Sequence, residues 1–188
     1  MGAVVDRLAS VRLTATGFGG PEVGGAWPDG DIRYYNAAPE HEWALQQAVD
    51  AWNRSGARVR LRRSNRLEAD LVVSSDARTT CGHGRATLGY SVPATISIFS
   101  FRVGRGCDRY AAARALTHEL GHVLGLDHTA AECAAMNPSG NYGGSPQCPP
   151  TRPGLWRCRL LEAGDLAATV KIYGGDPAPI RAEPLCAM

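Results

Sequence analysis

Three histidines and one glutamate occur together in the middle of the chain, at a spacing that suits a metal ion. The sequence of residues 118 to 128 is His-Glu-Leu-Gly-His-Val-Leu-Gly-Leu-Asp-His. Four residues along an α-helix correspond to about 400° of rotation and about 6 Å of rise, so His118 and His122 would project from one face, one turn apart. Glu119 would lie about 100° around the axis, where a carboxylate can orient a metal-bound water instead of coordinating the ion.

A catalytic zinc ion needs three protein ligands and one open position, and His128 is the predicted third ligand. Gly125 follows His122 by three residues, where the chain must leave the helix sharply, and glycine adopts the left-handed conformation without steric cost. This turn allows His128 to return to the ion. The full eleven-residue pattern would occur by chance in only about one in 10^5 chains of this composition. It therefore favours a zinc site over the alternative of ordinary solvated histidines on a surface helix.

The other two histidines are expected to lie outside this site. His41 is interpreted as a solvated residue of the first helix. His83, within Cys-Gly-His-Gly, is interpreted as a loop residue, with contact to a second metal ion as the alternative.

A methionine follows the third histidine by eight residues, in Ala-Ala-Met136-Asn-Pro138. The zinc pattern with a downstream methionine turn resembles the metzincin metalloproteases, and Met-x-Pro at this distance resembles their matrixin branch. Astacin-like and serralysin-like relatives have a tyrosine where this chain has Pro138. The resemblance implies that Met136 forms a hydrophobic floor below the zinc without coordinating it; the alternative is an ordinary core methionine.

The resemblance covers about residues 25 to 175. Trp-Pro-Asp-Gly at 27–30, Leu-Gly-Tyr-Ser at 88–91 and the segment 161–174 are similar to landmarks of matrixin catalytic domains. The segment 82–107 lacks the His- and Asp-rich loops that bind structural zinc and calcium in animal matrixins. We therefore expect one catalytic zinc, while calcium stays open without a recognisable site. The resemblance describes a bacterial-type, disulfide-containing variant.

Hydrophobic periodicity and turn residues give the elements that must position these side chains. In chain order they are a strand at 32–35, a helix from 39 followed by Gly56, strands at 59–61, 71–73, 86–91 and 95–101, a helix from Asp108 to about Gly125, and a last helix at 166–173 before Gly174. The fold class is α+β, with a mixed sheet and a helix packed on it. The resemblance implies a mostly parallel, twisted, five-stranded sheet with two long helices and a small C-terminal lobe with one helix.

One metalloprotease catalytic domain is expected over residues 1–188. Residues 1 to about 128 would form an upper lobe with the zinc helix, and residues 129–188 a lower lobe with the methionine turn. The segment 129–158 is rich in Gly and Pro without periodicity, and we predict a long ordered loop, which is usually functional.

Substrate would lie extended beside the strand at 86–91 as an added antiparallel strand, contacting Leu88, Gly89 and Tyr90. The loop after Met136 is predicted to wall the pocket past the scissile bond, with Tyr142 and Leu155 lining it. The alternative is a surface excursion without substrate contact.

Six cysteines without C-x-x-C pairs indicate disulfides and an oxidising compartment, hence a secreted protein. The start of the chain lacks a signal peptide, which we interpret as a mature form or a trimmed chain with an added Met-Gly. Cys81 and Cys107 bracket one predicted hairpin and are expected to pair. The pairing of the others stays open: Cys133, Cys148, Cys158 and Cys186.

Composition indicates a globular protein, at 44% hydrophobic and 20% charged residues with a net charge of +2. It gives no indication of a membrane or nucleic-acid partner, and we expect a monomer. Five arginines alternate with apolar residues, as on a solvated strand face, the alternative being contact with an acidic partner: Arg58, Arg60, Arg62, Arg63 and Arg66.

Together these patterns predict a secreted zinc-dependent endopeptidase that hydrolyses internal peptide bonds of proteins. Zinc would polarise the scissile carbonyl and activate water, and Glu119 would act as general base and then general acid. Two alternatives stay open: a non-catalytic zinc-stabilised binding module, which would not need Glu119, and a zinc hydrolase acting on a non-peptide bond. The substrate, its cleavage preference and the activation route are not predicted.

Overall fold

The computed structural model describes residues 25–79, 82–100, 108–130, 133–138 and 159–180. Its elements, in chain order, are β1 (Asp31–Asn36), the 3-10 helix η1 (Pro39–His41), α1 (Glu42–Asn53), β2 (Arg60–Arg63), β3 (Leu71–Asp76), β4 (Gly84–Ala86), β5 (Ala94–Phe99), α2 (Arg109–Val123) and α3 (Ala163–Tyr173). Several predictions fall outside the described residues: Tyr142 and Leu155, the loop beyond Pro138, and every cysteine except Cys133.

The five strands form one sheet in the order β2-β1-β3-β5-β4. The first four are parallel neighbours, whereas β4 runs antiparallel to β5 at the edge. The predicted mixed, mostly parallel five-stranded sheet with three α-helices is confirmed. No helix of the described residues is long and apolar enough to cross a membrane.

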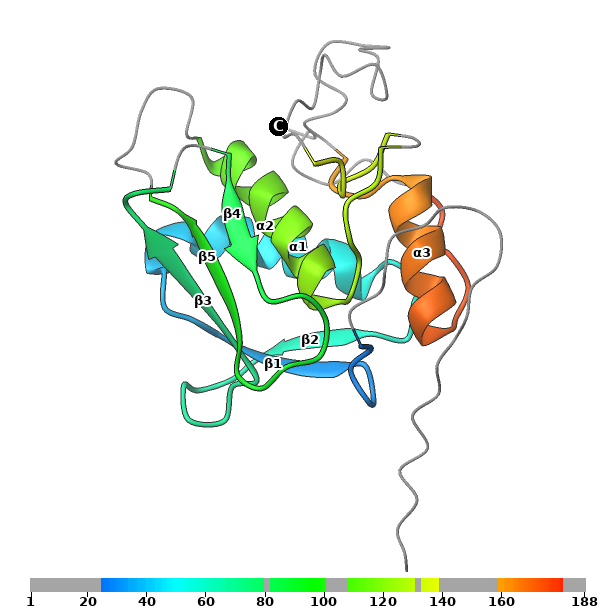
Figure 1. The fold of residues 1–188 in the computed structure, drawn as a ribbon, viewed down its shortest axis with the longest axis horizontal. Coiled ribbons are helices and arrows are strands. Elements are labelled where there is room, and N and C mark those ends of the chain that lie inside the picture. Colours follow the sequence, from blue (N-terminus) through cyan, green and yellow to red (C-terminus); the bar gives the residue numbers. More distant parts are fainter. Residues whose placement is uncertain (1–24, 80–81, 101–107, 131–132, 139–158, 181–188) are drawn as a thin grey trace, which may run out of the picture.

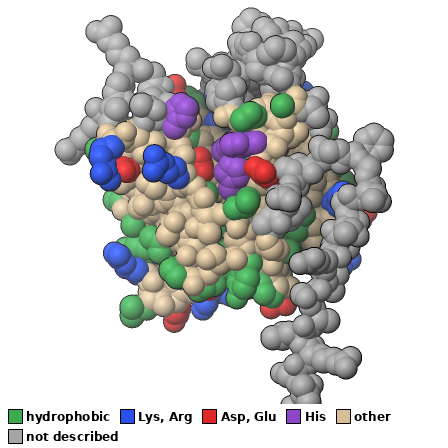
Figure 2. Space-filling view, in the orientation of Figure 1, with side chains coloured by type: hydrophobic (Ala, Val, Ile, Leu, Met, Phe, Trp, Pro, Cys, Tyr) green, Lys and Arg blue, Asp and Glu red, His purple; other side chains and the backbone are tan. Residues whose placement is uncertain are grey.

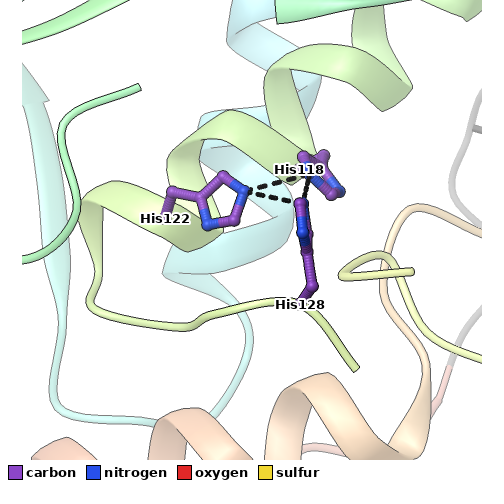
Figure 3. A group of neighbouring side chains, drawn as sticks. All are labelled: His118, His122 and His128. Atoms are coloured by element: carbon purple, nitrogen blue, oxygen red, sulfur yellow. Dashed lines mark hydrogen bonds between the residues drawn. The ribbon is translucent and has the colours of Figure 1, made fainter. Parts of the chain in front are cut away.

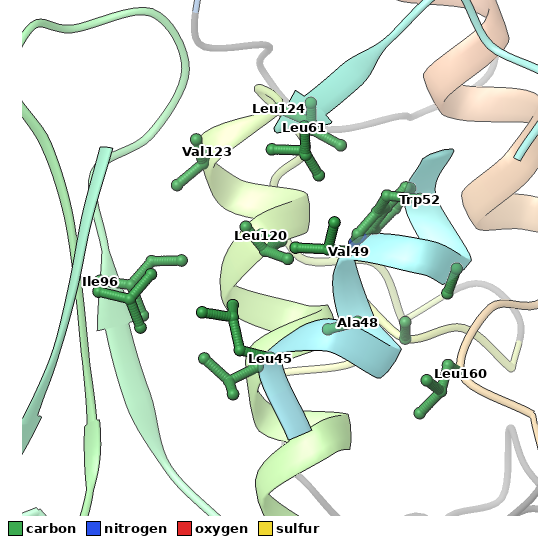
Figure 4. Packing of buried hydrophobic residues seen from close by; sticks show 14 of the residues in the cluster. Leu45, Ala48, Val49, Trp52, Leu61, Ile96, Leu120, Val123, Leu124 and Leu160 are labelled. Carbon is green, nitrogen blue, oxygen red and sulfur yellow. The ribbon is translucent and has the colours of Figure 1, made fainter. Parts of the chain in front are cut away.

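Helices α1 and α2 pack against each other behind the sheet (Figure 1), and their facing side chains join those of the strands in the core (Figure 4). Leu45 and Trp52 of α1, Leu120 of α2 and Ile96 of β5 are almost fully buried in one cluster. The Trp52 indole also donates to the Thr117 carbonyl of α2 at 3.0 Å. Each Å² of apolar surface buried in this cluster stabilises the packing by about 25 cal/mol. This burial holds α2 against the sheet.

The outer strand β2 shows the alternation of arginines and apolar residues that was predicted for a strand with one solvated face. In β2, Leu61 is buried while its neighbours Arg60 and Arg62 are exposed. Arg58, Arg63 and Arg66 are exposed too, so the predicted exposure of the arginines is confirmed, while contact with an acidic partner stays open.

The predicted strand at 86–91 is wrong in its position. The strand β4 covers Gly84–Ala86, and the chain leaves the sheet after the Thr87 N–H bonds the Thr95 carbonyl. Gly89 has a positive φ of 69° and donates its N–H to the His122 carbonyl at 2.8 Å. The segment therefore turns from the sheet toward the end of α2, because its backbone finds partners there.

The prediction that His41 is a solvated residue is also wrong. It lies in η1, fully buried, with its Nε2 2.6 Å from the Phe99 carbonyl oxygen and its ring edge-on to the Phe99 ring. Burial lowers its pKa. A tertiary contact with β5, 58 residues away, makes this histidine a core residue instead of a solvated one.

Candidate metal centre

Local interactions define both ends of the helix that carries the predicted ligands. Asp108, where the helix was predicted to begin, caps α2, since its carboxylate accepts the Ala111 N–H at 2.8 Å. At the other end Gly125 has a φ of 90°, and the N–H groups of Gly125 and Leu126 bond the carbonyls of His122 and Gly121. This is a Schellman motif. It ends the helix and turns the chain back toward its own last turn.

The turn brings the three predicted ligands together (Figure 3). The Nε2 atoms of His118 and His122 are 3.1 Å apart, those of His118 and His128 are 3.1 Å apart, and those of His122 and His128 are 3.2 Å apart. Nitrogen ligands at 2.0–2.1 Å from a tetrahedral zinc lie about 3.3 Å from one another. The three nitrogens therefore have the geometry of one face of a zinc tetrahedron, and they could hold that ion.

The other ring nitrogens fix the orientation of two of these side chains. His118 Nδ1 donates to the Ala135 carbonyl at 2.7 Å, and His122 Nδ1 donates to the Leu126 carbonyl at 2.8 Å. Because a carbonyl only accepts, the proton belongs on Nδ1, and the Nε2 lone pair faces the shared point. Burial lowers the pKa of His118 to about 4 and also lowers that of His122. The lowered pKa values favour the neutral form of both rings, which is the form that metal binding requires.

Glu119 lies beside the three histidines and is only 4% exposed. Burial raises the pKa of its carboxyl to about 7. Its side chain packs directly on the backbone of β4, where a Cβ added to Gly84 would lie 2.7 Å from Oε1. A glycine at this place is thus what leaves room for the carboxylate, a constraint that no sequence pattern indicated.

Met136 lies in a turn below α2. Its side chain is buried and its sulfur packs on Gly121, where an added Cβ would be 2.3 Å from Sδ. Asn137 stabilises the turn, accepting the Ala134 N–H at 3.0 Å and donating to the Thr129 carbonyl at 2.7 Å. The methionine is therefore placed beside the helix that carries the ligands. Cys133, at the start of the turn, is disulfide-bonded.

A cleft of about 580 Å³ opens over the three histidines. Histidine side chains reach the surface together near the middle of the face in Figure 2, with acidic side chains next to them. The lining residues come from β4 and its flanks, from α2 and from the segments after it: Gly82, His83, Gly84, Arg85, Ala86, Leu88, Ala111, Arg114, Ala115, His118, Glu119, His122, Asp127, His128, Asn137 and Pro138.

The predicted substrate-binding residues are placed differently from one another. Leu88 lines the cleft. Gly89 is bonded to the end of α2, and the Tyr90 ring packs edge-on against Trp27. His83, interpreted as a loop residue, is exposed at the rim of the same cleft, which its sequence context did not indicate.

The chain also matches a known family. The model of the Streptomyces extracellular neutral proteinase (M7) family matches residues 32–160, from β1 through the three histidines to just before α3. The chain belongs to this family. Members of the M7 family are zinc metalloproteases, in agreement with the three-histidine cluster.

Three related proteins are each named extracellular small neutral protease. The one from Streptomyces caespitosus is 29% identical over 116 residues, covering 59% of this chain and 77% of its own length. The one from Streptomyces lividans is 32% identical over 124 residues (61% and 48%), and that from Streptomyces sp. strain C5 is 31% identical over 122 residues (61% and 47%). The match thus spans about half the length of the last two relatives.

Proposed function

We propose that this chain is a secreted zinc-dependent endopeptidase that cleaves internal peptide bonds of protein substrates. The observation that carries the proposal is the convergence of three imidazole Nε2 atoms at 3.1–3.2 Å with a buried carboxylate beside them, at the base of an open cleft. The extracellular names of the M7 relatives support secretion. The disulfide at Cys133 agrees with an oxidising compartment.

In this proposal His118, His122 and His128 hold one zinc ion and Glu119 moves the proton. When bound, the ion polarises the scissile carbonyl and lowers the pKa of the attacking water. Glu119 takes the proton from that water and delivers it to the leaving nitrogen. Its pKa of about 7 before metal binding suits a group that must both accept and return a proton near neutrality.

The substrate is proposed to bind along β4 as an added antiparallel strand. One edge of β4 pairs with β5, and in the described residues no strand pairs with its other edge. Gly84, Arg85 and Ala86 line the cleft on that side, and Leu88 continues the wall. Main-chain hydrogen bonds of this kind hold a peptide regardless of its side chains.

The metzincin and matrixin-like assignment is part of the same proposal. It is supported by the turn at Met136, whose buried side chain packs on the ligand-bearing helix at Gly121. Met136 would then shape the floor of the site without coordinating the ion. The buried glutamate in an open cleft supports an enzyme over a non-catalytic zinc module, which has no use for a base there.

The test is casein digestion by the purified protein, with and without a zinc chelator, and elemental analysis of the same sample. We expect one zinc per chain, digestion that the chelator abolishes, and recovery on adding zinc back. A zinc-loaded protein that leaves casein intact would contradict the endopeptidase, and two firmly bound zinc ions would contradict the single site.

A further inference from the structure

Helix α3 contributes a buried carboxylate to the turn below the metal centre. Asp165 is 2% exposed and accepts three backbone N–H groups, from Ala135 at 2.8 Å, Met136 at 3.3 Å and Glu162 at 2.9 Å. A buried charge is costly unless it is hydrogen-bonded, and burial raises the pKa of this carboxyl to about 6 although the three bonds oppose the rise.

Only one of these three bonds is explained by the helix itself. The bond to Glu162 completes a capping box at the start of α3. The bonds to Ala135 and Met136 reach a different segment, about 30 residues earlier in the chain. These two bonds therefore stabilise the turn that contains Ala135 and Met136, and not the helix.

The turn at Ala135 also holds one of the proposed zinc ligands, His118. Ala135 gives its N–H to Asp165 and accepts the Nδ1–H of His118 at its carbonyl, at 2.7 Å. One residue therefore connects the carboxylate of α3 to the first histidine. A shift of the turn would rotate the His118 ring and move its Nε2 away from the other two ligands.

The far end of α3 contacts the other side of the metal centre. The Tyr173 hydroxyl donates to the Leu124 carbonyl at 2.9 Å and accepts the Trp27 N–H at 3.3 Å. The Trp27 indole donates to the Val123 carbonyl at 2.8 Å. Leu124 is the last residue before Gly125, where the chain turns from His122 toward His128.

From these two contacts we propose that α3 is a positioning element of the metal centre, in which Asp165 sets the orientation of His118 through Ala135 and Tyr173 holds the turn that leads to His128. This inference rests on the proposed zinc function. It goes beyond the family match, which ends at residue 160 and does not include α3. Neither residue touches substrate or metal, so both act through the segments that they hold.

The test compares Asp165→Asn with Thr169→Val in the full chain. Asparagine keeps the shape but replaces one acceptor oxygen with an NH2 group. This group opposes either the Met136 N–H or those of Ala135 and Glu162, so the turn loses an acceptor in either orientation. Thr169 is the matched control because it is buried in α3 and bonds the Asp165 carbonyl at 2.7 Å. Its loss weakens the helix while leaving the bonds to the turn.

Zinc affinity by chelator competition, the visible spectrum of the cobalt(II)-loaded protein, and kcat and KM are measured on each variant. We expect Asp165→Asn to lose about tenfold in zinc affinity, in line with partners of metal-ligating histidines, with an altered cobalt spectrum and a lower kcat at nearly unchanged KM. Tyr173→Phe should change zinc affinity in the same direction by less, and Thr169→Val should keep the wild-type affinity and spectrum.

Wild-type zinc affinity and spectrum in Asp165→Asn would overturn the inference, as would the same loss in Thr169→Val at equal thermal stability. If Asp165→Asn does not fold, Tyr173→Phe decides, because it removes only one hydroxyl; unchanged zinc affinity there overturns the proposal. A wild-type protein that binds zinc in none of these assays contradicts the proposed function itself, which separates the two failures.

Discussion

Two regions of this molecule concentrate ionisable side chains, and they are built in opposite ways. On the arginine face, defined by Arg58, Arg60, Arg62, Arg63 and Arg66, opposite charges pair in solvent: Arg62 bonds Asp31 at 2.8 Å, with both side chains well exposed. In the metal centre, like groups converge. Three imidazoles point one nitrogen each at a shared point, and two of them, His118 and His122, bond a carbonyl with the other nitrogen.

The difference indicates where function lies. In an exposed ion pair the two charges neutralise each other, and the pair contributes little to stability because solvent screens it. Converging lone pairs beside a buried carboxylate do not stabilise the fold by themselves. They suit the binding of a cation and the transfer of a proton. Changes in the metal centre should therefore affect catalysis strongly, and changes on the arginine face hardly at all.

The largest effect is expected from removing the base. Glu119→Ala removes the proposed base but none of the proposed ligands. It should therefore keep its zinc and lose about 10²- to 10⁴-fold in kcat, because that is the usual contribution of proton transfer. Zinc content and peptide hydrolysis are measured together. Glu68→Ala removes an exposed glutamate and is the control of equal charge. Wild-type turnover in zinc-loaded Glu119→Ala would contradict the expectation that changes in the metal centre affect catalysis more than changes on the arginine face.

An intermediate effect is expected from crowding the base without removing it. In Gly84→Ala the new methyl group would lie 2.7 Å from both Cγ and Oε1 of Glu119, so that buried side chain must move. A displacement of about 1 Å in an active site can cost up to about 10²-fold in rate, so we expect a clear fall in kcat with an almost unchanged melting temperature. Gly25→Ala, with nothing within 4 Å of its new Cβ, is the control. Full activity in Gly84→Ala would mean that the position of the base is not critical.

The smallest effect is expected on the arginine face. Arg62→Ala breaks the pair with Asp31, whose side chain is 39% exposed, and should change the free energy of unfolding very little, because solvent screens exposed ion pairs. Activity on casein should not change. A double-mutant cycle with Asp31→Ala measures the pair directly. Reduced cleavage of acidic substrates by Arg62→Ala would instead show that this face binds a partner.

Much of the fold was predictable because its signals are local. The first helix, the start of α2 at Asp108 and the glycine after α3 were all confirmed in place. The strand at 86–91 was wrong because Leu88, Gly89 and Tyr90 have a strand-like sequence, yet their backbone finds partners at the end of α2 and at Gly25. Propensity could not weigh those distant partners.

By itself, the sequence determined the three converging histidines and the adjacent glutamate, since the pitch of a helix and the left-handed turn at Gly125 fix their geometry within eleven residues. Only the tertiary structure decided what surrounds them. The space at Gly84 that admits the Glu119 carboxylate and the bonds from Asp165 to the turn at Ala135 join segments far apart in the chain. Such contacts depend on how the sheet, α2 and α3 pack together, and packing leaves no periodic pattern in the sequence around either residue.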